Sequence, residues 1–137
     1  MAVLNPRYAL LTVAYCIMIF ILSSMPYPER FSTGIRDEDK VAHCVLYGGL
    51  AFVVSMGLRK RGRPVRPSVQ FLAPVLFAFL YVISDECHQF FVPGRTADPW
   101  DACSDALGGL LVQIVLCFFV WRLHRVSGKP ENAPRIG

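Results

Sequence analysis

Four long apolar runs with almost no charge limit what this chain can fold into. They cover residues 8–24, 41–58, 69–84 and 102–121. Hydrophobic residues make up 54% of the 137 residues and charged residues 18%, whereas a soluble domain carries about 25% charged residues. Each run approaches the ~17–25 residues that a helix needs to cross a bilayer core, although the third is short unless its polar end extends it. Because backbone groups in lipid must be satisfied within their own segment, we predict helices. The predicted fold is an all-α, integral membrane four-helix bundle.

The length indicates one domain, which we expect over residues 1–126. The tail at 127–137 is polar, contains two prolines and is predicted to be disordered. The first run could instead be a signal peptide, because Arg7 precedes it. No A-x-A-like cleavage site follows, however, and the apolar core is long for a signal peptide. We favour a retained helix.

Lysine and arginine residues predict which helix ends face the cytoplasm. The link between the second and third runs and the C-terminal tail are rich in basic residues, namely Arg59, Lys60, Arg61, Arg63, Arg66, Arg122, Arg125, Lys129 and Arg135. Short basic links stay in the cytoplasm, so a four-helix chain has both termini inside (N-in/C-in). The outward side then holds nine of the ten carboxylates. The net charge of +4 is explained by these links, and without interleaved aromatic residues no nucleic-acid partner is expected.

The five cysteines show no CxxC spacing. We expect free thiols, which behave as small hydrophobic groups inside apolar runs. A disulfide or soft metal site among Cys44, Cys87 and Cys103 is the less favoured alternative.

The first polar motif is DKVAHCVLY, at the start of the second run. Asp39, His43 and Tyr47 are spaced four residues apart and share one helix face, and Lys40 lies one position around. Asp39 could cap the helix, a structural role as plausible as a functional one. His43 lies inside the apolar run, where a polar group is costly and usually faces the bundle or a water cavity.

The second motif is SDECHQFFVPGR, at the end of the third run. If the helix continues, Asp85 and Gln89 lie one turn apart. Adjacent carboxylates repel each other, so at least one of Asp85 and Glu86 is expected to need a compensating cation. As a functional residue we favour Glu86 ahead of His88. The Pro-Gly pair that follows then turns Arg95 back toward the acids.

The third motif opens the fourth run. Asp98 precedes a proline and is predicted to cap the helix, with Asp101 as its partner three residues on. Asp105 lies a full turn inside the apolar run, where a carboxylate needs a partner. The candidate partners are His43, Lys40 and Arg95.

Two glycine pairs, Gly48-Gly49 and Gly108-Gly109, lie just below this predicted cluster. Small residues let membrane helices approach closely. We therefore expect contact between the second and fourth helices there, which would bring Asp105 toward His43.

Together these motifs resemble those of the VanZ-like family of small bacterial membrane proteins, over residues 24 to about 111. The matching positions are Asp39, Lys40, His43, Glu86, Gln89, Phe91, Pro93, Gly94, Arg95, Asp101 and Gly108. The family commonly has Asn where this chain has Asp105, and the added charge favours a protonated, salt-bridged or metal-bound carboxylate. The resemblance implies a multi-pass protein of the bacterial cytoplasmic membrane. It also implies a link to the cell envelope, since founding members are associated with low-level resistance to glycopeptide antibiotics such as teicoplanin.

One hypothesis is an enzyme that acts at the outer leaflet on a lipid-linked envelope substrate. His43 and Glu86 would form an acid/base pair, or would bind a divalent metal with Asp101 and Asp105. Positively charged or polar groups would hold an anionic head group or cell-wall precursor, and these are Lys40, Tyr47, Gln89 and Arg95.

The second hypothesis is a non-catalytic binding or assembly protein, in which the polar cluster is a structural network that fixes helix register. In either case Gly94 and Gly108 would serve the fold. A transporter is a weaker third interpretation, because four short helices offer little room for a pore. An oligomer could change that.

Overall fold

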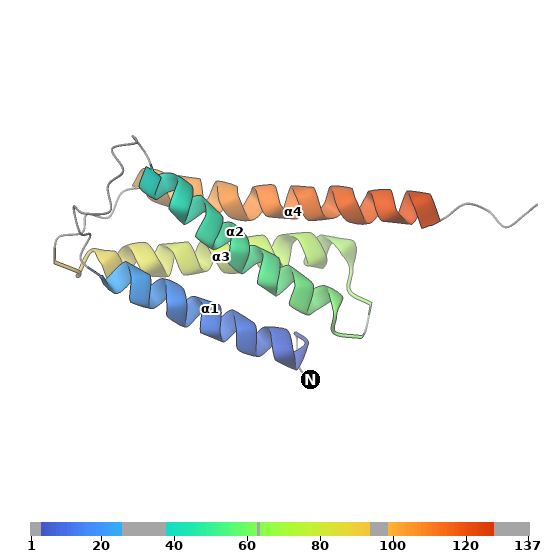
Figure 1. The fold of residues 1–137 in the computed structure, drawn as a ribbon, viewed down its shortest axis with the longest axis horizontal. Helices are drawn as coiled ribbons and strands as arrows, with labels where there is room; N and C mark the ends of the chain where they lie inside the picture. The colour runs from blue at the N-terminus through green and yellow to red at the C-terminus, as the bar shows by residue number, and fades with distance from the viewer. Residues whose placement is uncertain (1–3, 26–37, 63, 94–98, 128–137) are drawn as a thin grey trace, which may run out of the picture.

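Over the residues that the computed structural model describes (4–25, 38–62, 64–93 and 99–127), the chain forms four helices and no strand (Figure 1). The helices are α1 (Pro6–Ser24), α2 (Glu38–Arg59), α3 (Pro67–Gln89) and α4 (Pro99–Ser127). The all-α prediction is confirmed. Side chains are described throughout these ranges except at 38–40, 99–102, 104, 121 and 123–127. The predicted disordered tail, apart from its first residue, lies outside the described residues.

Helices α1, α2 and α3 each contain a segment long and apolar enough to cross a membrane. In α4, the apolar segment found within the described residues is shorter, Asp105–Val120. The third run gains its length from its polar end, because α3 continues without a break to Gln89. Large apolar side chains are exposed on every described helix, for example Leu10 at 71%, Val45 at 68%, Leu80 at 65% and Phe119 at 57%. A surface this apolar fits contact with lipid and does not fit contact with water.

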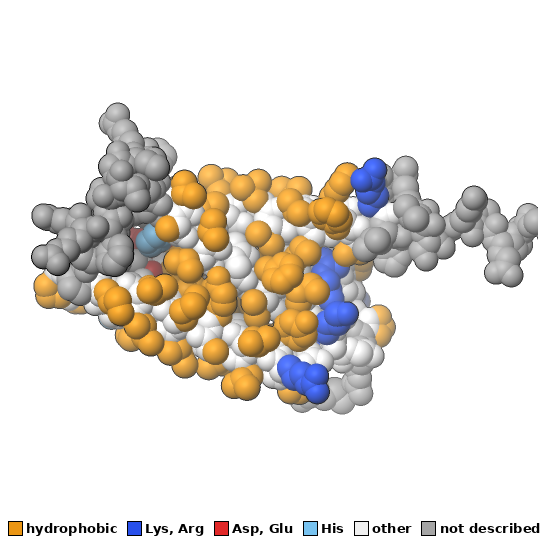
Figure 2. All heavy atoms as spheres, viewed as in Figure 1, with side chains coloured by type: hydrophobic (Ala, Val, Ile, Leu, Met, Phe, Trp, Pro, Cys, Tyr) orange, Lys and Arg blue, Asp and Glu red, His pale blue; other side chains and the backbone are white. Residues whose placement is uncertain are grey.

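Charged residues separate toward the two ends of the bundle. Where α1 begins, α2 ends and α3 begins, the chain carries Arg7, Arg59, Lys60, Arg61 and Arg66, and we call this the basic end. On the face shown in Figure 2, Lys and Arg side chains gather there, and apolar side chains cover the middle. The opposite end, where α1 and α3 end and α2 and α4 begin, is called the His/Asp end after four of its residues. These are His43, Asp85, His88 and Asp105.

The start of α1 is fastened to the end of α2. Asn5 caps α1 by accepting a hydrogen bond from the Arg7 backbone N–H, and its own backbone N–H donates to the Gly57 carbonyl at 3.1 Å. Its side-chain amide donates to the Lys60 carbonyl at 2.9 Å. These contacts fix the place of α1 in the bundle.

Helix α2 contacts each of the other described helices and packs most extensively on α4. The expected glycine contact is present. A Cβ atom added at Gly48 would lie 3.2 Å from the Gly108 carbonyl oxygen, and one added at Gly108 would collide with the Cys44 carbonyl group. The absence of a side chain at Gly108 lets the backbones of α2 and α4 approach so closely, and a methyl group at Gly48 would also be tight.

The apolar core lies between α1, α2 and α3, midway along the bundle. It contains Ile19, Leu50 and Val82, which are at most 2% exposed, together with the ring of Tyr47. This core separates the polar side chains of the His/Asp end from those of the basic end.

Candidate functional site

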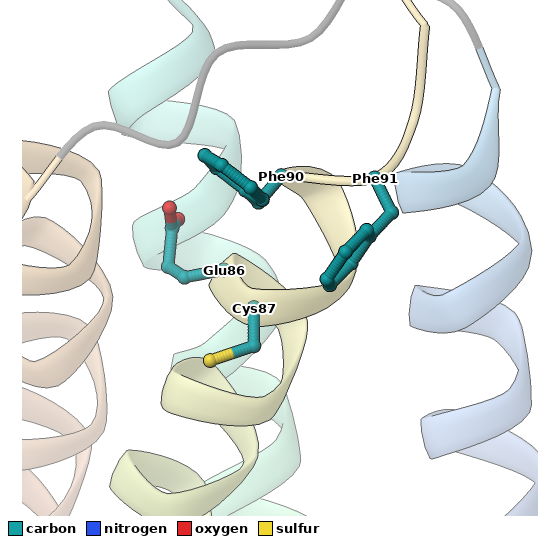
Figure 3. A pocket seen from close by; sticks show the side chains of 4 residues that line it. All are labelled: Glu86, Cys87, Phe90 and Phe91. Atoms are coloured by element: carbon teal, nitrogen blue, oxygen red, sulfur yellow. The ribbon is translucent and has the colours of Figure 1, made fainter.

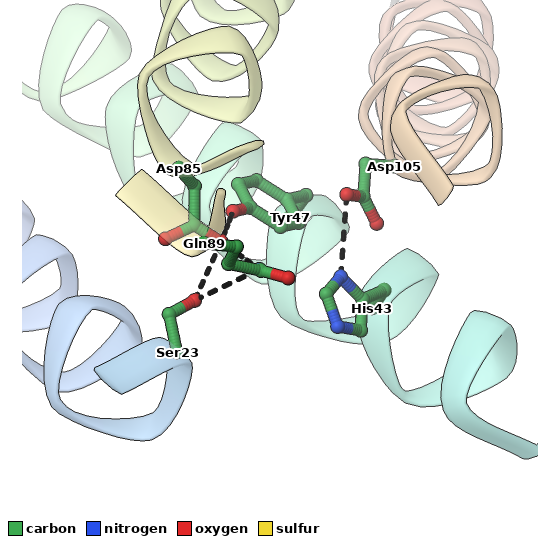
Figure 4. Close-up of polar contacts among 6 residues, drawn as sticks. All are labelled: Ser23, His43, Tyr47, Asp85, Gln89 and Asp105. Atoms are coloured by element: carbon green, nitrogen blue, oxygen red, sulfur yellow. Dashed lines mark hydrogen bonds and ion pairs between the residues drawn. The ribbon is translucent and has the colours of Figure 1, made fainter. Parts of the chain in front are cut away.

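Asp85 is the centre of a buried polar network at the His/Asp end (Figure 4). One oxygen, Oδ2, accepts three hydrogen bonds, from Ser23 Oγ at 2.6 Å, Tyr47 Oη at 2.8 Å and Gln89 Nε2 at 2.8 Å. Gln89 also donates to Ser23 Oγ at 3.2 Å. The members come from α1, α2 and α3, so a single carboxylate joins three helices.

All four members of this network are shielded from solvent. Ser23 is 5% exposed, Tyr47 1%, Asp85 4% and Gln89 3%. A buried carboxylate is costly unless hydrogen bonds satisfy it, and the three donors on Oδ2 do so. The network therefore stabilises contact between the helices that supply it.

The inward face of α3 explains why Asp85 occupies this place. Ala78, Val82, Asp85 and Gln89 follow one another at spacings of four, three and four residues, and all are buried. Glu86 lies one position further around the helix and is only half-buried. The helical repeat thus points the first of the two adjacent acids inward and the second to the side.

His43 and Asp105 form a second polar contact, between α2 and α4. The Nδ1 atom of His43 lies 3.3 Å from Asp105 Oδ2, and the two side chains are 15% and 1% exposed. A carboxylate on one ring nitrogen fixes the orientation of an imidazole. In this pair, the buried Asp105 orients the ring of His43, which is partly exposed.

The two contacts lie side by side at the same end of the bundle. His43 and Tyr47 are one turn apart on α2, and their ring centroids are separated by 6.2 Å. Figure 4 shows Tyr47 turned to Asp85 and His43 turned to Asp105. Each of the four described helices contributes to this group, α4 through Asp105.

His88 adds a third contact at the same end. Its Nε2 atom lies 2.9 Å from Ser24 Oγ. Because Ser24 donates its one hydroxyl proton to the Phe20 carbonyl at 2.7 Å, the ring nitrogen of His88 is the donor to Ser24. The contact joins the end of α1 to the end of α3.

Four residues expected to form a site are brought together here: His43, Tyr47, Gln89 and Asp105. Tyr47 and Gln89 were expected to bind a substrate, and both are buried donors to Asp85. Their role as substrate contacts stays a prediction.

Glu86 lies on a different surface. With Cys87, Phe90 and Phe91 it lines a shallow, open hollow of about 370 Å³ on the last turn of α3 (Figure 3). Phe90 and Phe91 are 73% and 79% exposed. The predicted catalytic role of Glu86 remains untested by this arrangement.

Six other expected site residues lie wholly or partly outside the described residues. The side chains of Asp39, Lys40 and Asp101 are not described, although α2 begins at Glu38 and places the first two in its first turn. Gly94, Arg95 and Asp98 lie outside the described residues altogether. Helix α4 begins at Pro99, the position expected if Asp98 is its cap. The roles of all six stay predictions.

No three His, Cys, Asp or Glu side chains within the described part of the chain are placed to hold a metal ion. The predicted pairing of Asp101 with Asp105 as metal ligands lies partly outside it. All five cysteines, which lie in described helices, are free thiols.

Sequence reasoning missed two parts of the polar interior. It did not select Ser23, although two serines end the first apolar run, and it selected Glu86 but not Asp85 as a site residue despite the Asp85–Gln89 spacing. It also missed a second network near the basic end. There Ser55 donates to Gln113 Oε1 at 3.2 Å, and Gln113 donates to the Ala51 carbonyl at 3.2 Å. Glutamine inside the fourth apolar run was the available signal for it.

A family model described as VanZ/LLP1 matches residues 8–121. That range contains the described helices α2 and α3 whole, most of α1 and α4, and all the polar contacts at the His/Asp end. No curated protein and no solved structure matches the chain. The extent of the family match and the apolar helices lead to one assignment: this chain is a membrane protein that belongs to the VanZ/LLP1 family.

Proposed function

We propose that this protein binds an anionic, lipid-linked component of the bacterial cell envelope at its His/Asp end. In this proposal the chain is a multi-pass protein of the cytoplasmic membrane, with one domain over residues 1–126 and both termini inside. The His/Asp end then faces outward, where envelope precursors carried on lipid phosphates are exposed.

The observation that carries the proposal is the His43–Asp105 pair. His43 is partly accessible, and Asp105 holds its ring through Nδ1 at 3.3 Å. An imidazole in a fixed orientation can donate a hydrogen bond to a phosphate oxygen or exchange a proton with it. The sequence supplies further cations for such a group at Lys40, one turn before His43, and at Arg95.

A second candidate function is that of a purely structural network, and Asp85 favours it. Its three donors come from three helices and are all buried, which is what a register-fixing contact requires. The two candidate functions would then belong to different carboxylates. Asp85 would hold the helices together, and Asp105 would orient the residue that meets the ligand.

The test is binding of a long-chain polyprenyl phosphate to the purified protein in detergent, with the uncharged polyprenol of the same length as reference. His43→Ala should weaken phosphate binding about tenfold, as expected for loss of one hydrogen bond to a charged group. The thermal midpoint should fall only slightly: His43 is partly exposed, although its loss also removes one partner of the buried Asp105. His88→Ala is the matched control, since it removes a half-buried histidine at the same end that is held by Ser24.

Equal affinity in wild type and His43→Ala would contradict the proposal. So would equal binding of the phosphate and the uncharged alcohol, because the polyprenyl chain alone would then account for the affinity. If His43→Ala lost stability together with binding, the structural function would be favoured instead.

A further inference from the structure

The second polar network leads to a site that does not depend on the proposed function. Ser55 and Gln113 are both 0% exposed, and they join α2 to α4 in the half of the bundle nearer the basic end. A side-chain hydrogen bond between membrane helices contributes little net stability. Stability alone is therefore a weak reason to bury a serine and a glutamine at these positions.

The network extends outward to Arg59, the last residue of α2. Arg59 Nε donates to Ser55 Oγ at 3.3 Å, and Nη1 lies 3.5 Å from Gln70 Oε1 on α3. The side chain is half-buried. Ser55 thus accepts a hydrogen bond from the guanidinium and itself donates to Gln113, while Gln70 contacts the guanidinium from α3.

The charge of Arg59 is not balanced within the described part of the protein. Both of its polar partners there are neutral oxygens, and no described carboxylate forms an ion pair with it. A guanidinium has five N–H donors, so three remain after these two contacts. Lys60, Arg61 and Arg66 follow closely and add positive charge. A half-buried cation in such surroundings favours an external anion.

We propose that the basic end holds a site for a phosphate group, centred on Arg59 and supplied by the head group of an anionic phospholipid. The planar guanidinium suits two parallel hydrogen bonds to phosphate. Basic pockets between membrane helices are known to bind such head groups. The Ser55–Gln113 pair acts as the positioning support that keeps the guanidinium oriented. The apolar surfaces of the neighbouring helices accept the acyl chains.

The experiment measures retention of phosphatidylglycerol by the purified full chain in native mass spectrometry. Arg59→Gln should lower the apparent affinity about tenfold, the loss expected when one two-bond pair to phosphate is removed. Arg61→Gln is the matched control, because it removes the same charge two residues away, and it should change affinity less than twofold. Equal losses in both variants would mean diffuse attraction by the basic link and would overturn the site.

Two further measurements test the positioning role of Ser55 and the source of the phosphate group. Ser55→Ala leaves every charge in place and removes the acceptor for Nε, so it should lower affinity severalfold; no change would overturn the positioning role. If Arg59→Gln fails to fold, Arg59→Lys replaces it. This variant keeps the charge but loses the planar guanidinium, and it should still lower the affinity for phosphatidylglycerol more than Arg61→Gln does.

Inorganic phosphate at the lipid concentration should not displace phosphatidylglycerol. Full displacement would assign the site to a free phosphate ion and overturn the lipid.

Discussion

At the scale of single residues, Asp85 shows how a membrane bundle keeps a carboxylate buried. Three donors converge on one oxygen, and each arrives from a side chain at most 5% exposed. The cost of removing the charge from water is several kcal/mol. It is offset because the donors lie on α1, α2 and α3 itself, so that packing of the helices completes the network.

This arrangement predicts an ordered loss of stability. Tyr47→Phe removes one donor and should lower the free energy of unfolding by about 1 kcal/mol, near the upper range for one hydrogen bond between membrane helices. Asp85→Ala removes the acceptor that the three donors share, although Gln89 keeps Ser23 Oγ, and it should cost about 2–3 kcal/mol. Unfolding in mixed micelles with increasing denaturing detergent measures both changes.

Cys87→Ala is the control for these variants, because Cys87 is exposed on the outer side of the same helix. It should change stability by less than about 0.5 kcal/mol. Equal stability of Asp85→Ala and wild type would show that the network does not hold the helices.

At the scale of helices, the contact of α2 with α4 decides whether His43 reaches Asp105. Gly108, three residues after Asp105, lies against the carbonyl group of Cys44, the residue that follows His43. A methyl group at position 108 would separate the helices where the pair forms.

Gly108→Ala should therefore lower the free energy of unfolding by about 2 kcal/mol, the usual cost of overpacking. Gly109→Ala is the matched control one residue away. Its Cβ would lie 3.6 Å from Ala78 and 3.7 Å from Ala51, which is ordinary contact. It should stay within about 0.5 kcal/mol of wild type. Similar losses in both variants would contradict the close contact, with thermal unfolding in detergent as the measurement.

The same helices show how far sequence reasoning reaches. The apolar runs predicted each described helix, and the glycine pairs predicted which two pack closely. The rotation of α3 was not predicted. In a soluble helix, polarity marks the face that turns outward, but in lipid the buried Val82 and the exposed Leu80 are equally apolar. Without that signal, the sequence did not show which of Asp85 and Glu86 faces the bundle, and only Glu86 was selected as a site residue.

Ser23 and Ser55 were missed for a related reason. A serine hydroxyl is small and occurs often in membrane helices, so its presence in an apolar run carries little information. Its partner lies more than 50 residues away in each case. Only the packed bundle reveals such a pair.

At the scale of the whole molecule, α2 links the two ends. Its residues at steps of four make the polar contacts of both networks: His43, Tyr47, the Ala51 carbonyl, Ser55 and Arg59. These positions form a stripe that winds around α2 from the His/Asp end to the basic end. The apolar core of Leu50 and Val82 lies between the networks and keeps them apart.

The separation of charge along the bundle fits one orientation in a membrane. Basic residues gather at the end where α2 passes into α3 (Figure 2), and the buried acids Asp85 and Asp105 lie at the other end. Positive residues stay on the cytoplasmic side. The His/Asp end is therefore expected to face outward, where an envelope component can reach His43.

We propose that the His/Asp end faces outward, and thiol labelling tests this orientation. In a variant whose five native cysteines are replaced by alanine, a single cysteine is placed by Phe91→Cys, a position 79% exposed beyond α3, or by Arg61→Cys on the basic link. A membrane-impermeant maleimide applied to intact cells should label Phe91→Cys, and should label Arg61→Cys only after the membrane is opened. Labelling of Arg61→Cys in intact cells, with Phe91→Cys protected, would contradict the orientation and the outward site with it.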